Sequence, residues 1–149
     1  MAAQVLILLI IGIAFYGLEL PTQPSKWLTF TWLLLLGSAS STALGVAFSS
    51  VPKNGRGAAA IVSPVVIILQ FFSGVFFVFT QLPGWMQQIA AFFPLKWLTQ
   101  GMRSVFLPDS FATQEVAKSW ESGRTALILL AWLIAGLFLA VKTFRWERK

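Results

Sequence analysis

Residues 71–97 read FFSGVFFVFTQLPGWMQQIAAFFPLKW, an apolar stretch whose only charged residue is Lys96. The stretch begins as a membrane-crossing helix would, but Pro83, Gly84 and Pro94 interrupt the helix while the sequence stays apolar. Irregular backbone at membrane depth persists only where it is buried in protein or lines a water-filled cavity. The stretch therefore predicts a segment that dips into the apolar layer and turns back without crossing it.

The composition of the whole chain is that of a membrane protein. Of its 149 residues, 57% are hydrophobic and 11% are charged, whereas soluble proteins carry roughly 25% charged residues. The net charge of +6 is scattered between long uncharged runs, which indicates membrane orientation rather than nucleic-acid binding. Cysteine and histidine are absent from the sequence. Their absence excludes a disulfide framework, a thiolate nucleophile and a Cys/His metal cage.

Four runs are long enough to cross a membrane, since a helix needs about 20 mostly apolar residues to span the ~30 Å hydrocarbon layer. We predict spans at about 2–18, 27–50, 57–79 and 125–142, with the interrupted hairpin at about 81–107. A signal peptide is the alternative for residues 1–18, but the basic start and small-residue cleavage site of such peptides are lacking. The predicted fold is an all-α integral membrane protein with four transmembrane helices and an external re-entrant helical hairpin before the last span.

The flanking charges predict the orientation of these spans. Lys53 and Arg56 lie between the second and third spans, and the tail KTFRWERK (residues 142–149) is also basic. On the other side of the predicted membrane, basic residues are nearly balanced by acidic ones. Cytoplasmic loops carry the excess of Lys and Arg. We therefore expect this loop and both termini in the cytoplasm, with the chain in the plasma membrane.

Small residues recur at four-residue spacing along the second predicted span. Helices in lipid associate by close van der Waals approach, which such spacing permits. The predicted packing ridge consists of Gly37, Ser41, Gly45 and Ser49. Ordinary helix packing and a place in a transport path are both compatible with it.

Polar side chains in the third predicted span carry a different signal. Ser63, Gln70 and Ser73 fall on one side of a helix. A bare Gln amide at membrane depth costs several kcal/mol. Gln70 therefore either bonds to a neighbouring helix or borders a hydrated cavity, and the sequence leaves both open. These three residues are the candidates for lining a path.

Beyond Pro94 the hairpin continues as an amphipathic helix. Lys96, Gln100 and Arg103 recur on one face, as in helices that lie at a membrane interface. Trp85 and Trp97 suit the headgroup level, where aromatic belts form. A hairpin lying on the membrane surface is the alternative to a re-entrant one. The residues assigned to the hairpin are Pro83, Gly84, Trp85, Pro94, Gln100 and Arg103.

The order of these parts resembles the membrane subunits of ABC type-2 exporters, which are efflux permeases. The resemblance rests on LGSASSTALGVAFSS, then VPKNGRG, SGVFF and QLPGWMQQIAAFFPLKWLTQGMRSVFLPD. In that family a phrase of the form SGVFFP, LPGWLQ, PL and Arg precedes the external hairpin and last span. Val78 stands where many relatives have proline, which implies a weaker kink. The resemblance covers the last four spans of a six-span protein, so we expect a partial permease domain over residues 1–149.

The resemblance implies an exporter of an amphipathic drug, lipid or polysaccharide, driven by a separate ATP-binding cassette ATPase. A second permease subunit would complete a homo- or heterodimer. ATP would bind to the partner, because the chain lacks a G-x-x-x-x-G-K-[ST] phosphate loop; no cofactor is expected on this chain. We expect the loop at residues 51–57 to contact the ATPase through Lys53, Asn54 and Arg56.

Two other function classes deserve comparison. An intramembrane enzyme would need buried ionisable groups, and the interiors of the predicted spans contain none. A membrane scaffold or a small self-associating channel is compatible with the small-residue ridges. Co-purification with an ATPase subunit would separate an exporter from a scaffold or channel.

Overall fold

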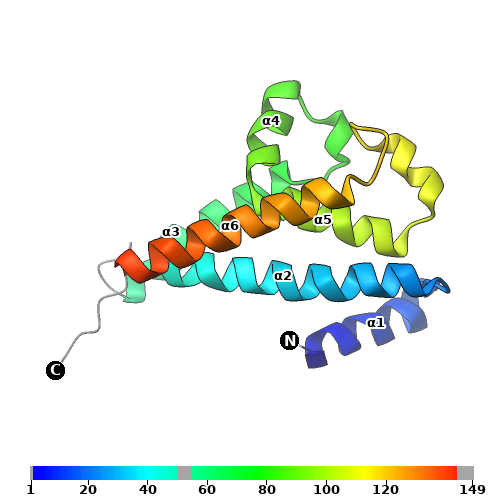
Figure 1. Cartoon of the computed structure of the whole chain (residues 1–149), viewed down its shortest axis with the longest axis horizontal. Coiled ribbons are helices and arrows are strands. Elements are labelled where there is room, and N and C mark those ends of the chain that lie inside the picture. Colours follow the sequence, from blue (N-terminus) through cyan, green and yellow to red (C-terminus); the bar gives the residue numbers. More distant parts are fainter. Residues whose placement is uncertain (1, 50–54, 144–149) are drawn as a thin grey trace.

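The computed structural model describes residues 2–49 and 55–143, and in this part every regular element is helical (Figure 1). Two short 3-10 helices, η1 and η2, lie between α3 and α4 and between α5 and α6. The elements are α1 (Ala2–Tyr16), α2 (Pro24–Phe48), α3 (Gly55–Phe72), η1 (Phe79–Gln81), α4 (Gly84–Phe92), α5 (Pro94–Phe106), η2 (Asp109–Gln114) and α6 (Ser122–Thr143). The predicted all-α class is confirmed for these residues.

Two of the helices, Pro24–Phe48 and Ser122–Lys142, are long and apolar enough to cross a membrane. They lie side by side and run in the same direction (Figure 1). The helix α3, which follows α2 in the sequence, runs back the other way (Figure 1). Two shorter apolar helices, Ala3–Tyr16 and Ala60–Phe72, correspond to the other predicted spans. Four crossings therefore remain a prediction, of which two are supported by helix length and composition.

Small residues bring α2 and α6 together. A Cβ atom added at Gly136 of α6 would lie 3.0 Å from the Cβ atom of Ala43 and 3.1 Å from the backbone nitrogen of Leu44. Ala47 and Ala140 are also buried. The two backbones thus approach closely, as helices with small contact residues do in lipid.

The predicted ridge on α2 lies to one side of this contact. Gly37 packs against Leu98 of α5, whereas Ser41, Gly45 and Ser49 are exposed. The helix instead turns Ser40, Ala43 and Ala47 inward. Packing by the three exposed ridge residues therefore stays a prediction.

The third predicted span, 57–79, is longer than the helix observed. α3 ends at Phe72, and Gly74 adopts a φ of +77°, a conformation that glycine reaches at little cost. A Cβ atom there would lie 3.1 Å from that of Phe79 and 3.3 Å from Nη1 of Arg103. The expected continuation to residue 79 is wrong, because the backbone turns at Gly74 although the sequence stays apolar.

α4 and α5 form two arms joined at Phe93. Phe93 is extended (φ −90°, ψ 148°) and Pro94 begins α5, since a residue before proline avoids the helical region. α5 runs antiparallel to the first half of α2: Leu98 meets Gly37, and Gly101 meets Leu33 further along. The corner between the arms contacts α6, where the indole Nε1 of Trp132 donates a hydrogen bond to the Phe92 carbonyl at 2.8 Å.

The buried apolar core joins α2, α5 and α6. Phe30 and Leu33 of α2 meet Val105 of α5 and Leu129 of α6 in one cluster. The hairpin is thus part of the packed bundle, and α5 places its polar residues at fixed positions relative to the two long helices.

Candidate functional site

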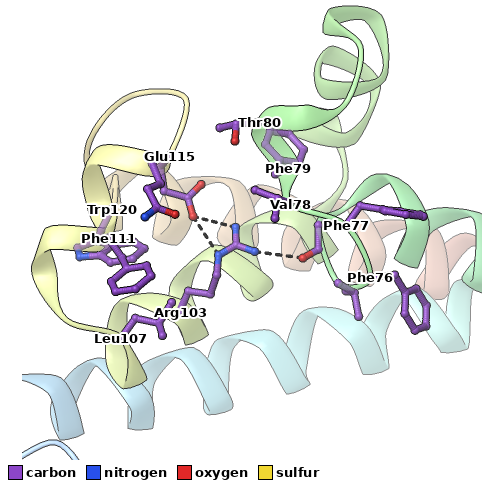
Figure 2. Close-up of a pocket in the computed structure, with 13 residues that line it drawn as sticks. Phe76, Phe77, Val78, Phe79, Thr80, Arg103, Leu107, Phe111, Glu115 and Trp120 are labelled. Atoms are coloured by element: carbon purple, nitrogen blue, oxygen red, sulfur yellow. Dashed lines mark hydrogen bonds and ion pairs between the residues drawn. The ribbon is translucent and has the colours of Figure 1, made fainter.

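A cavity of about 310 Å³ lies between the residues that follow α3, the helix α5 and the segment Leu107–Glu121, which we call the strap (Figure 2). Its wall is largely aromatic and aliphatic. The lining residues are Gly74, Val75, Phe76, Phe77, Val78, Phe79, Thr80, Arg103, Leu107, Phe111, Gln114, Glu115 and Trp120. The SGVFF motif and Arg103, both singled out in the sequence, therefore meet in one place.

Arg103 joins three separate segments at this cavity (Figure 2). Its Nε and Nη2 atoms each lie 2.9 Å from Oε1 of Glu115 in the strap. Its Nη1 donates a hydrogen bond to the Gly74 carbonyl at 3.1 Å, just beyond α3. The planar guanidinium carries several donors in fixed directions, which suits it to bridge a carboxylate and a carbonyl.

The sequence indicated Arg103 but not its partner. Glu115 is 8% exposed, yet it lies in a polar segment where an acidic residue is unremarkable. A buried carboxylate needs an opposite charge, but local sequence does not reveal that burial. Only the folded strap brings Glu115 to Arg103.

A second polar contact holds the far end of the strap. The Lys96 ammonium donates a hydrogen bond to Oε1 of Gln100 at 2.5 Å, and both residues are buried. Nε2 of Gln100 lies 3.1 Å from the carbonyl of Trp120 and 3.4 Å from that of Ser119. The Lys96 nitrogen also lies 3.5 Å from the Trp97 ring centre, a cation–π geometry.

This arrangement revises the amphipathic interpretation of α5. The polar face formed by Lys96, Gln100 and Arg103 turns toward the strap, so protein groups satisfy it. Trp97 is 2% exposed and donates to the Ala91 carbonyl at 2.7 Å. The indole of Trp97 thus holds the two arms of the hairpin together, and its expected headgroup position stays a prediction.

The remaining hairpin residues have local roles. Pro83 precedes α4 as its N-cap residue, and Gly84 is the first residue of that helix. Trp85 is 57% exposed, and its ring makes a T-shaped contact with that of Phe72. Exposure of Trp85 is compatible with the predicted headgroup position.

The three candidates for a path do not line this cavity. Ser63 is exposed and Gln70 is half-buried on α3. Ser73 is fully buried directly after α3, and its hydroxyl has no hydrogen-bond partner within the part of the chain that the structure describes. Their shared role remains a prediction.

A family model described as ABC-2 family transporter protein matches residues 1–142. The chain belongs to the ABC-2 transporter family. No curated protein and no solved structure matches it. ABC-2 permeases are membrane subunits of ABC exporters that work with an ATP-binding subunit and are not themselves catalytic enzymes. The resemblance found in the sequence is thus confirmed over nearly the whole chain.

The loop expected to contact the ATPase in this ABC-2 permease is not tested by the structure. Lys53 and Asn54 lie outside the described residues, and Arg56 is described only as part of the α3 backbone. Among residues 2–49 and 55–143, no group of three or more Asp or Glu side chains is placed to hold a metal ion.

Proposed function

We propose that this ABC-2 permease exports an amphipathic substrate of the drug, lipid or polysaccharide class, driven by ATP hydrolysis on a separate subunit. Most of the chain forms apolar helices. The cavity beneath the strap combines aromatic walls with one charged pair, Arg103 and Glu115. Such a surface suits a molecule with an apolar body and a polar part.

The proposed topology has four crossings and a re-entrant hairpin at about 81–107. The observation that supports it is the position of the hairpin corner along α2 and α6. Leu98, near this corner, packs on Gly37, which lies about 20 Å along α2 from Pro24 at the rise of an α-helix. Trp132, which bonds to the corner, lies about 15 Å along α6 from Ser122. If α2 and α6 cross the membrane, the corner lies near its middle.

The two shorter helices fit this topology with less margin. α1 has 15 residues and α3 has 18, so they measure about 22 and 27 Å against a hydrocarbon layer of ~30 Å. A small deficit of this kind is met by local thinning of the bilayer. Both termini and the loop at 51–57 would then lie in the cytoplasm of a plasma-membrane protein.

In this proposal Lys53, Asn54 and Arg56 contact the ATPase, and a second permease subunit completes the transporter. Ser63, Gln70 and Ser73 line part of the path. Nucleotide-driven closure of the ATPases would shift the helices, so that substrate leaves past the hairpin. Ser73 is the best-supported of the three, because its buried hydroxyl has no hydrogen-bond partner among the described residues and the next residue, Gly74, lines the cavity.

The test is transport in inverted membrane vesicles from cells that make the chain with its co-purifying ATPase subunit. A fluorescent amphipathic dye and a fluorescent phospholipid serve as probes. We expect uptake that requires ATP and disappears when the ATPase subunit carries an inactive phosphate loop. Uptake without ATP would indicate a self-associating channel, and absence of any ATPase partner would indicate a scaffold.

A further inference from the structure

The strap, Leu107–Glu121, is held to the bundle by polar contacts rather than by apolar packing. Glu115 is the one buried residue in it. Phe111 and Val116 are 40% and 57% exposed. A segment with so little buried apolar surface has low local stability, so its polar contacts decide whether it stays in place.

Both ends of the strap are tied down. At its start, the Lys26 ammonium of α2 donates to the Leu107 carbonyl at 3.0 Å and lies 3.3 Å from the Asp109 carboxylate. At its end, the Gln100 amide donates to the Trp120 carbonyl at 3.1 Å. These contacts fix the two ends to α2 and α5 and leave the middle as the part that can move.

Of the polar contacts described here, only the one from Arg103 holds the middle of the strap. Its two bonds to Glu115 are 2.9 Å long, and the same guanidinium holds the Gly74 carbonyl on the opposite wall of the cavity. Arg103 therefore bridges two opposite walls of the cavity (Figure 2). Loss of this one side chain would free both walls.

The end of the strap carries backbone strain. Lys118 and Glu121 have φ values of 52° and 46°, in the left-handed region that residues with a side chain rarely adopt. Such strain persists only where the surrounding contacts impose it. Lys118 precedes the tied residue Trp120, so rotation at Lys118 would relieve its strain and let the middle of the strap move away while the end stays fixed.

We propose that the strap is a lid over the cavity, that Arg103 latches it shut through Glu115, and that Lys118 is its hinge. Arg103 is thus a positioning residue that couples the end of α3 to the strap. Only the role of the lid in substrate release depends on the proposed function. The latch itself can be measured without transport.

The test uses distances between two spin labels, because the sequence has no cysteine and a Cys pair can be introduced without background. Thr113→Cys places one label on the exposed side of the strap, and Val141→Cys places the other on α6, where this residue is 82% exposed. The labelled full chain is diluted with unlabelled chain in proteoliposomes, so that distances between copies do not contribute. We expect one narrow distance population.

Glu115→Gln and Arg103→Gln should each shift part of this population to a second distance. Arg124→Gln is the matched control, because its 3.0 Å ion pair with Glu121 is between near neighbours in sequence and crosses no cavity. It should leave the narrow population unchanged. A label pair at Leu28 and Val141, both exposed, reports on the bundle and should not change in any variant.

Each other outcome overturns the proposal. An unchanged strap distance in both latch variants would show that other contacts hold the strap. A shift in Arg124→Gln of the same size would show a loop that moves with any change of charge. A simultaneous change in the Leu28–Val141 distance would assign the Arg103–Glu115 pair to bundle stability instead.

Discussion

Gly101 of α5 lies against Leu33 of α2 so closely that a Cβ atom at Gly101 would be 2.6 Å from the Leu33 Cδ2 atom. Leu33 is completely buried, so its side chain would have to change rotamer inside the packed core. The hairpin can lie along α2 at this depth only because residue 101 has no side chain.

Gly101→Ala should therefore destabilise the protein by about 1–3 kcal/mol, the usual cost of overpacking. Thermal unfolding in detergent measures the loss. Gly84→Ala is the control, because nothing lies within 4 Å of its added Cβ atom. Adding Leu33→Ala to Gly101→Ala should restore part of the lost stability, and failure of both effects would show that α5 does not pack there.

Gly136→Ala should be harder to accommodate than Gly101→Ala. Its added Cβ atom meets backbone atoms of Ala43 and Leu44 at 3.1 Å, and backbone cannot rotate away as a leucine side chain can. We expect a loss at the upper end of about 1–3 kcal/mol, measured in the same assay. Gly123→Ala, with open space around it, should be neutral, and an equally neutral Gly136→Ala would contradict the close contact between α2 and α6.

Lys96→Glu should lower folded yield strongly. The carboxylate would replace the ammonium beside the negative face of the Trp97 ring, and disrupting a buried charge contact costs about 3–5 kcal/mol. Lys96→Met should cost less, about 1–3 kcal/mol, because it leaves Gln100 with one unmet hydrogen bond. Lys118→Glu changes an exposed lysine of the strap and serves as control; equal losses in all three variants would argue against a special role for buried Lys96.

Gln70→Leu should change the range of exported probes while membrane insertion stays normal. Its amide is half-buried on α3, so the substitution removes hydrogen-bonding capacity without making the helix less apolar. Transport of the dye and the phospholipid is compared with the amount of chain in the membrane. Ile67→Leu, an exposed neighbour, is the control. An unchanged transport profile would assign Gln70 to helix packing.

Charge reversal in the loop, Lys53→Glu with Arg56→Glu, should reduce co-purification of the ATPase subunit by about tenfold, the effect of roughly 1.4 kcal/mol. Arg124→Glu reverses a charge on the opposite side of the proposed membrane and should leave the amount of bound ATPase unchanged. Intact association in the double variant would move the ATPase contact elsewhere on the chain.

Much of the fold followed from local sequence. Proline at position 94 begins α5 because proline lacks a backbone N–H and fits the first helical turn, and the apolar runs fall on helices. The extent of α3 did not follow from it. Residues 73–79 are as apolar as the helix before them, yet Gly74 turns the chain where the Arg103 guanidinium binds its carbonyl, a contact between residues distant in sequence.

The amino-acid sequence alone determined that this chain is helical, apolar, interrupted by a hairpin and similar to ABC-2 permeases. These properties depend on helix-breaking residues, on charge and on hydrophobicity, which act within a few residues of each position. Only the tertiary structure decided which face of α2 packs and which acid meets Arg103. Those choices depend on how side chains pack between segments that are far apart in the sequence. A local sequence pattern does not predict such packing.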